Sequence, residues 1–289
     1  ISDRKNASSA WKGGIFMAQY RIPLLIWLIF EAVAVGLWLG LGNIFYLFNF
    51  SYIGTCIAVG LALYSAKWKH ARRFVQFAVG LYLLGFLGLY EGENMQIEGF
   101  WCYLALGVFS GPTIHYLVAK IAGPVLFGRG FCGYACWTAM VLDLLPFKAR
   151  QKKRPKWEWM RFVFLAASIA IAALILLFAE NREQTLFAAF VIGNVLYYMV
   201  GISLAFALWD NRAFCKYLCP VGLLMKPAAH VSLLRIKCDH SLCVKCGACK
   251  RACPMDVDMT NNARNRERGT ECILCLSCVD ACPKHALKL

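Results

Sequence analysis

Long apolar runs alternate with short polar segments over the first 208 residues of the chain. Six runs are long enough to cross a bilayer as helices, because a crossing takes about 20 residues. They are Pro23–Leu41, Ile44–Tyr64, Phe74–Tyr90, Phe100 to about Phe127, Met160–Ala179 and Thr185–Leu208. The pattern predicts an all-α bundle of six transmembrane helices over residues 23–208.

The polar segments between these runs alternate in charge. The second and third segments between runs hold Lys67, Lys69, Arg72 and Arg73, and then Glu91, Glu93 and Glu98 without Lys or Arg. A basic run, 148–156, follows the fourth apolar run, and Arg182 is the only basic residue expected in an outer loop. The positive-inside rule therefore predicts cytoplasmic termini in a multi-pass protein of a prokaryotic cytoplasmic (inner) membrane. Residues 1–22, polar and without a signal-peptide pattern, are expected to be a cytoplasmic segment.

The fourth apolar run contains signals that interrupt a helix. Gly111-Pro112 and Gly123-Pro124 flank His115 and Lys120. Proline removes a helical hydrogen bond, so the sequence predicts a kinked or broken helix here. Such a helix either lines a substrate cavity or is a plain kink.

Composition changes after residue 208, where the chain becomes polar and rich in cysteine. Hydrophobic residues make up 60% of the whole chain, and 15 residues are cysteines. A disulfide scaffold is typical of small secreted chains, so metal ligation is the better interpretation of these thiols. We expect a cytoplasmic linker over residues 209–237 and a small α+β domain over 238–289.

Two cysteine runs in the last 50 residues follow one spacing. Each run has the form C-x2-C-x2-C-x3-C-P, which is typical of bacterial-type [4Fe-4S] ligation, with the fourth cysteine binding the other cluster. The prediction is two [4Fe-4S] clusters in a two-cluster, bacterial ferredoxin-like domain. Zinc binding is the alternative, because C-x2-C pairs also bind that metal. The ligands expected for cluster 1 are Cys243, Cys246, Cys249 and Cys282, and those for cluster 2 are Cys272, Cys275, Cys278 and Cys253.

A second repeat, F-C-x-Y-x-C, follows the fourth and sixth apolar runs. Its cysteines are Cys132, Cys136, Cys215 and Cys219. Both copies are expected at the same membrane surface, where four thiols could bind a third cluster or another metal, or form redox-active disulfides. They could equally be anchors at helix ends.

Residues 74–289 resemble the NapH/NosR/RdxA class of membrane polyferredoxins. The resemblance rests on the two F-C-x-Y-x-C copies, the second of which ends in Cys219-Pro220, and on the two-cluster domain that follows them. The resemblance implies electron transfer between the quinol pool and partner redox proteins, or maturation and regulation of respiratory enzymes. Two departures are clear. Trp137 stands where the class usually has proline, and neither a NosR-type flavin domain nor an immunoglobulin-like extension is present in the sequence.

Several other features have weaker interpretations. Glu31 lies within the first apolar run, where it either takes up protons at a quinone site or bonds to a neighbouring helix. His115 is the only histidine within a run, which argues against a membrane haem. The basic run indicates topology and lipid contact rather than nucleic acid. We assign no role to Cys56, Cys102 and Cys238.

These observations predict a membrane-bound electron-transfer subunit, quinol dehydrogenase-like, that works between a quinone pool or membrane partner and a cytoplasmic redox partner. The expected partners are other redox subunits in a hetero-oligomer, or an acidic cytoplasmic electron carrier attracted by basic residues. The alternatives are a redox sensor or assembly factor for a respiratory enzyme, and a structural anchor for a soluble reductase.

Overall fold

The structure is a computed structural model, and it describes residues 2–147 and 155–289, with side-chain surroundings described from Tyr20 onward. Most of the predicted basic run, 148–154, lies outside the described residues. The chain divides into two compact units, residues 1–79 and 80–289. Each unit is described by itself.

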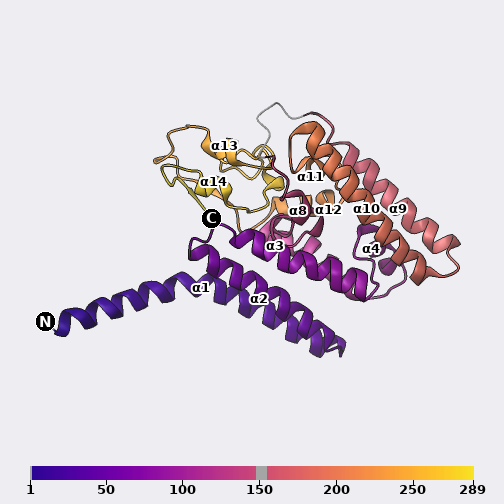
Figure 1. Cartoon of the computed structure of the whole chain (residues 1–289), viewed down its shortest axis with the longest axis horizontal. Coiled ribbons are helices and arrows are strands. Elements are labelled where there is room, and N and C mark those ends of the chain that lie inside the picture. Colours follow the sequence, from indigo (N-terminus) through magenta and orange to yellow (C-terminus); the bar gives the residue numbers. More distant parts are fainter. Residues whose placement is uncertain (1, 148–154) are drawn as a thin grey trace. The chain divides into compact units, whose positions relative to one another are not determined.

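Helices dominate the described residues, as the sequence predicts. The elements, labelled in Figure 1 where there is room, are α1 Ser2–Leu41, α2 Phe45–Ser65, α3 Ala71–Leu81, π-helical η1 Tyr82–Tyr90, α4 Ile97–Ala105, α5 Gly111–His115, π-helical η2 Tyr116–Ala122, α6 Gly123–Phe127, α7 Gly130–Tyr134, α8 Trp137–Leu142, α9 Met160–Phe178, α10 Arg182–Leu208, α11 Ala213–Tyr217, α12 Val221–His230, β1 Lys237–Cys238, α13 Ala248–Ala252, 3-10 helical η3 Gly269–Glu271, α14 Ser277–Asp280 and β2 Leu287–Lys288.

Five helical segments among the described residues are long and apolar enough to cross a membrane. They are Tyr20–Leu41 in α1, Phe45–Ser65, Ala71–Tyr90 formed by α3 and η1, Met160–Phe178 and Arg182–Leu208. This confirms a helical membrane protein, with five of the six predicted apolar runs found as long helices.

The first unit is built on a close helical pair. Gly42 has a positive φ of 69°, and the side chain of Asn43 accepts a hydrogen bond from the Phe45 backbone, so the chain reverses between α1 and α2. The hydroxyl of Ser51 in α2 donates to Glu31 in α1 over 2.6 Å. Of the two interpretations of Glu31, the structure therefore supports the bond to a neighbouring helix.

The fourth apolar run is broken in the second unit. After η1, the side chain of Asn94 donates to the Leu186 carbonyl, and Cys102 in α4 then donates to the Ala172 carbonyl. Gly107 turns the chain at φ 67°, and Pro112 begins the next helical stretch at its first turn. The predicted break is confirmed, but it falls earlier than the two Gly-Pro pairs alone suggest, because residues 97–105 form a separate short helix and 111–127 form a second stretch.

Of the acidic residues from the predicted outer loop, Glu98 is buried and Glu93 is partly buried by this arrangement. Glu98 lies in the first turn of α4 and is 6% exposed, and the carboxylate of Glu93 lies close to Gly111. Segment 91–98 therefore packs within the second unit, as re-entrant segments do when protein rather than lipid surrounds them. Such packing does not follow from the charge pattern that defined the loop.

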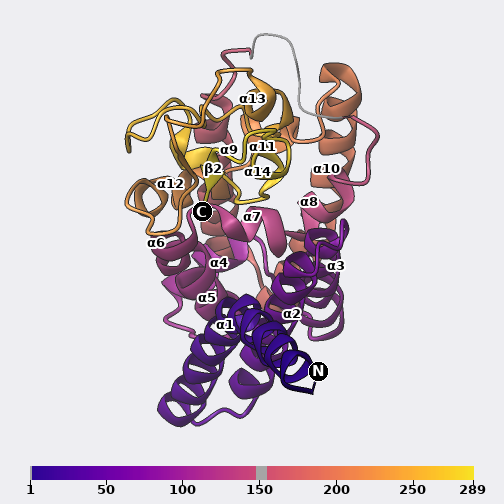
Figure 2. The ribbon, with the colours of Figure 1, turned by 90° about the vertical axis from the view of Figure 1, so that its left-hand side faces the viewer.

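The C-terminal segment folds around its cysteines with little regular structure. β1 and β2 form an antiparallel pair in which Lys237 faces Lys288 and Cys238 faces Leu287. Figures 1 and 2 show this segment, in yellow, beside α11 and α12. It belongs to the same compact unit as the helices from Gly80 onward.

Candidate iron–sulfur site

The structure gathers the first predicted ligand set around one cavity. The cavity is lined by Cys243, Cys246, Cys249 and Cys282, together with Cys238. Cys243 and Cys246 lie in the loop before α13 and Cys249 lies in its first turn, whereas Cys282 follows α14. The fourth ligand therefore comes from the other cysteine run, as the crossed pattern predicts.

The second predicted set lies around a second, smaller cavity. Its thiols are Cys253, Cys272, Cys275 and Cys278, and the rest of its lining is largely apolar. Ile236 and Met255, both 1% exposed, close this cavity from two sides. The two cavities therefore have the crossed ligand sets but different surroundings.

The two runs share one backbone conformation, although their intervening residues differ. Lys245 and Leu274 occupy equivalent positions before the second cysteine, and both have a positive φ, 54° and 52°. The last cysteine of each run also accepts a hydrogen bond from the backbone amide four residues later. The Val257 backbone donates to Cys253 over 3.4 Å, and the Ala286 backbone donates to Cys282 over 3.3 Å.

The donor chemistry of both cavities fits a [4Fe-4S] group. Among the described residues, no three His, Cys, Asp or Glu side chains converge closely enough to share a single metal ion. A cubane differs from a single ion in this respect, since each thiolate binds a different iron at a different corner. Four thiols spread around a cavity suit the cluster better than zinc, which needs convergent ligands.

The two F-C-x-Y-x-C copies also adopt one conformation. The backbone amides of Ala135 and Cys136 both donate to the Phe131 carbonyl, and those of Leu218 and Cys219 both donate to the Phe214 carbonyl. Burial, with a smaller contribution from the neighbouring thiols of Cys132 and Cys215, raises the pKa of Cys136 to about 12. The same effect of burial raises the pKa of Cys215 to about 11. The structure therefore brings the four cysteines into one buried neighbourhood.

Each copy carries an arginine that the sequence analysis missed. Arg129 lies three residues before Cys132, with its guanidinium 3.9 Å from the sulfur. Arg212 stands three residues before Cys215, 4.0 Å from that sulfur. Both arginines are 1% exposed or less. The sequence does contain a signal for them, because both copies of the repeat extend by two residues at the start to R-x-F-C-x-Y-x-C.

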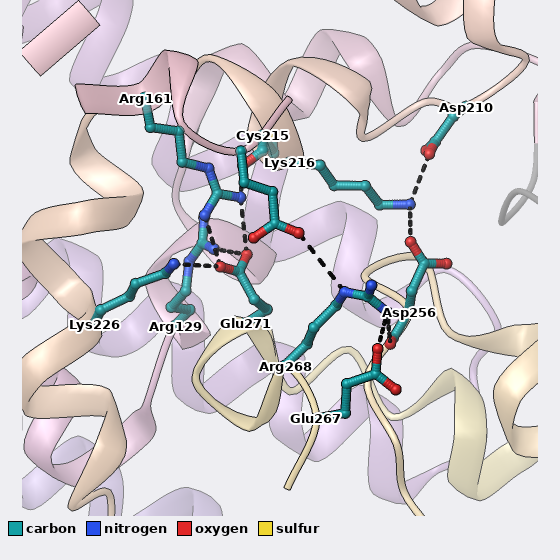
Figure 3. A network of polar contacts seen from close by, with 11 residues as sticks. Arg129, Arg161, Asp210, Cys215, Lys216, Lys226, Asp256, Glu267, Arg268 and Glu271 are labelled. Atoms are coloured by element: carbon teal, nitrogen blue, oxygen red, sulfur yellow. Dashed lines mark hydrogen bonds and ion pairs between the residues drawn. The ribbon is translucent and has the colours of Figure 1, made fainter. Parts of the chain in front are cut away.

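Glu271 joins the C-terminal segment to the helices through buried charges. Its carboxylate accepts from Arg129, from Arg161 at 2.7 and 3.0 Å, and lies 3.6 Å from the Lys226 ammonium (Figure 3). Burial alone would raise the pKa of Glu271, but Arg129 and Arg161 outweigh it and lower the pKa to about 2. Glu271 directly precedes Cys272, so the charge cluster fixes one ligand loop against the four-cysteine region.

Backbone contacts place the same loop still closer to the first copy. The Arg129 amide donates to the Cys272 carbonyl over 3.3 Å, and the Tyr134 hydroxyl donates to the Leu274 carbonyl over 3.0 Å. A side chain at Gly133 would lie 2.3 Å from the Ile273 carbonyl oxygen. Only glycine allows this approach, and the cavity of Cys272 is therefore the one packed against the helices.

A second cluster of ion pairs joins the second copy of the repeat to the C-terminal segment. The Lys216 ammonium lies between Asp210 at 2.6 Å and Asp256 at 2.8 Å (Figure 3). Lys216 is fully buried, and Asp256 follows the Cys253-Pro254 pair. Each copy of the repeat thus has its own ionic contact to a ligand-bearing loop of the C-terminal segment.

The interrupted fourth run supplies further buried groups beside these cysteines. The Lys120 ammonium lies 3.5 Å from the centre of the Tyr116 ring and 5.2 Å from those of Phe131 and Trp137. His115 is 6% exposed, and its Nε2 finds no hydrogen-bond partner among the described residues. Trp137 itself, the departure from the class pattern, donates to Asn194 over 2.8 Å.

Comparisons with known families match both cysteine regions. A profile described as "4Fe-4S dicluster domain" matches residues 235–283, and one described as "4Fe-4S binding domain" matches 116–156 and 192–237. The second match includes all four cysteines of the R-x-F-C-x-Y-x-C copies. The chain is an iron–sulfur protein.

Several curated proteins are similar to this chain at 24–28% identity. MauN of Methylobacillus flagellatus, a "methylamine utilization ferredoxin-type protein", is 28% identical over 68% of this chain and 79% of its own length. RdxA of Cereibacter sphaeroides is 25% identical over 76% of this chain and 57% of its own. NapH of Haemophilus influenzae, a "ferredoxin-type protein", is 24% identical over 57% of this chain and 63% of its own.

The resemblance to the NapH/NosR/RdxA class of membrane polyferredoxins is confirmed. NosR of Pseudomonas aeruginosa matches 73% of this chain but only 32% of its own length. No solved structure matches the chain.

Proposed function

We propose that this chain is a membrane-bound electron-transfer subunit that carries electrons between a quinone pool or membrane partner and a cytoplasmic redox partner. Two [4Fe-4S] clusters would supply one-electron transfer. The observation that carries the proposal is the crossing of the ligands, since each cavity takes three thiols from one run and one from the other. A printed name of one relative, "putative electron transport protein" for YccM of Escherichia coli, supports the same role.

The proposed orientation places both termini and both cavities in the cytoplasm of a prokaryotic cell. It is supported by the basic residues Lys67 and Lys69 on one side and by the near absence of basic residues from the opposite loops. The five long helices and the broken segment 111–127 would then supply six crossings. Cysteine accessibility labelling of single-cysteine loop variants in intact cells would test this topology.

The crossing of ligands has a direct test in iron content and EPR spectra. Cys282→Ala should abolish the signal that Cys243→Ala also abolishes, although Cys282 belongs to the other run. Cys56→Ala is the matched control, because Cys56 lies outside both cavities and should leave two clusters per chain. If Cys282→Ala and Cys272→Ala instead remove the same signal, the crossed assignment is wrong.

The quinone link is tested by the choice of reductant. Anaerobic EPR of the detergent-purified chain is recorded after a menaquinol analogue or after dithionite. Reduction by the quinol supports a quinone site within this chain. Reduction by dithionite alone would assign that site to another subunit of a hetero-oligomer.

We propose a third redox site at Cys132, Cys136, Cys215 and Cys219. Its support is the shared buried neighbourhood, the arginine beside each copy and the 4Fe-4S profile that covers both. Cys132→Ser with Cys215→Ser should lower the electron transfer rate between quinol and the C-terminal clusters. Unchanged iron content together with unchanged transfer would contradict a third site.

A redox sensor or assembly factor is the second candidate. It is favoured by one observation, which is that two of the four neighbouring thiols, Cys132 and Cys215, each lie about 4 Å from a buried arginine side chain. Slow turnover with quinol and reversible oxidation of these thiols would support the sensor over the electron carrier.

A further inference from the structure

The cavity of Cys243, Cys246, Cys249 and Cys282 opens onto a basic surface. Lys245 and Lys284 line the cavity, and both side chains are exposed. Cys246 is itself exposed, the only one of the eight predicted cluster ligands in that class. The cavity therefore presents a thiol and two ammonium groups directly to solvent.

More cations surround this opening, and we call the set the basic rim. It consists of Lys237, Lys245, Lys250, Arg251, Lys284 and Lys288, all exposed. Lys237 and Lys288 face each other across the strand pair beside the cavity, and Arg251 donates to the Cys246 carbonyl over 3.2 Å. Acidic groups near the rim are few, with Asp239 partly exposed and Asp280 exposed.

Apolar side chains stand among these charges. Leu242 is 45% exposed and Val244 is 58% exposed, on either side of Cys243. An apolar centre within a charged rim is the usual anatomy of a protein interface. The surface is thus suited to a protein partner and not only to small anions.

The cavity of Cys272 has the opposite character. Its loop is held by Glu271 between buried arginines, and its lining includes Met259 at 3% exposure and Ile273 at 2% exposure. No basic side chain lines it. An external carrier could therefore approach the Cys243 cavity far more closely, and electron transfer slows steeply with distance.

We propose that an acidic one-electron carrier docks on the basic rim and exchanges electrons with the group held by Cys243, Cys246, Cys249 and Cys282. The proposal rests on the electron-transfer function above and names the surface its soluble partner uses. The electron route then joins the carrier to the Cys243 cavity, then to the Cys272 cavity, and from there past Glu271 and Arg129 to the helices. Whichever of the carrier and the chain loses one electron, the other gains it, so the exchange balances without a further reactant.

Charge complementarity gives this proposal a measurable signature. Opposite charges accelerate encounter, and the acceleration falls as salt screens them. Reduced plant-type ferredoxin, an acidic one-electron protein, serves as the probe donor to the oxidised full-length chain in detergent. Stopped-flow absorbance gives the second-order rate constant at low and at high ionic strength.

The test variant is Lys245→Glu with Lys284→Glu. Its matched control is Lys67→Glu with Lys69→Glu, which changes the net charge equally at exposed residues between α2 and α3. We expect the test variant to react at least about tenfold more slowly at low salt and the control to stay within about twofold. At high salt the test variant and the unmodified chain should converge.

Three observations keep the outcomes distinct. Iron content and EPR signals of each variant must match those of the unmodified chain. The rate constant of Lys245→Gln with Lys284→Gln should lie between those of the unmodified chain and of the glutamate variant. Equal rates for the test and control variants, in a chain that accepts electrons from ferredoxin, overturn the docking surface while leaving the proposed function intact. A chain with the iron content of two clusters that gives no EPR signal after either ferredoxin or dithionite, and so accepts no electron, would overturn both.

Discussion

Replacing Glu271 by glutamine should loosen the C-terminal segment from the helices. The carboxylate is the shared partner of Arg129 and Arg161, whose side chains are fully buried. Glutamine keeps one carbonyl acceptor but removes the negative charge, so two buried guanidinium groups lose their compensation. The structure therefore predicts local opening at the contact between Gly128–Tyr134 and residues 271–274.

The magnitude follows from the burial of this pair. Removing one member of a buried ion pair costs about 3–5 kcal/mol. A pKa of Glu271 lowered from its usual 4.5 to about 2 corresponds to about 3 kcal/mol, so the two figures agree in order of magnitude. Since 1.4 kcal/mol is a factor of ten, we expect local opening to become about 100-fold more frequent.

Amide hydrogen exchange measures this local opening directly at the contact. The amide of Arg129 donates to the Cys272 carbonyl, so its exchange should accelerate about 100-fold in Glu271→Gln. Glu267→Gln is the matched control, because Glu267 is 65% exposed in its side chain and pairs with Arg268 at the surface. Surface pairs contribute about 0–1 kcal/mol, so the control should change little.

Peptides from α9 and α10 provide the internal reference. If they also exchange faster, the variant has unfolded globally rather than opened at the contact. The reasoning is refuted if Glu271→Gln and Glu267→Gln exchange alike at Arg129 while α9 and α10 stay protected.

Three further predictions follow from the same region. Gly133→Ala should lower the free energy of unfolding by about 1–3 kcal/mol, because the new side chain would lie 2.3 Å from the Ile273 carbonyl oxygen. The measurement is amide hydrogen exchange of residues 271–276, which should be faster than in the control Gly85→Ala, where the nearest atom is 3.9 Å away. Lys216→Met should lower the thermal unfolding temperature in detergent by leaving Asp210 and Asp256 buried without their cation, and adding Asp256→Asn should restore part of the loss. The EPR signal that depends on Cys243 should titrate at a higher midpoint potential than the signal that depends on Cys272. The reason is that Lys245 and Lys284 line the Cys243 cavity and not the Cys272 cavity. Equal midpoint potentials would contradict this prediction.

The cysteine chemistry could be predicted from sequence because it is encoded locally. In each run three thiols are separated by two residues, and left-handed residues such as Lys245 and Leu274 turn the chain between them. The trailing cysteine also repeats, with an amide four residues later bonded to its sulfur. Spacing alone therefore predicts which cysteines meet, and here the structure brings the predicted sets together.

The contacts that hold the segment in place could not be predicted in this way. Glu271 lies 142 residues from Arg129 and 110 residues from Arg161. No spacing rule links such distant positions, and each arginine alone looks like a topology signal. The broken fourth run was recognised from Pro112 and Pro124, but hydropathy could not separate the nine residues of α4 from the following stretch, because both are apolar.

The extended repeat gives a reason why charges, and not only apolar surface, hold the C-terminal segment. Buried ion pairs are weak evidence for stability, yet their geometry can select one arrangement among many. Arg129 and Arg212 each contact a cysteine sulfur of their own copy, while Arg129 also binds Glu271 beside Cys272. One side chain thus contacts both the four-cysteine region and the loop of the Cys272 cavity. A segment held only by apolar contacts could shift without losing them, whereas Glu271 binds Arg129 and Arg161 together in one position. Fixing that position sets the distance across which an electron must pass, which is the quantity an electron-transfer protein has to control.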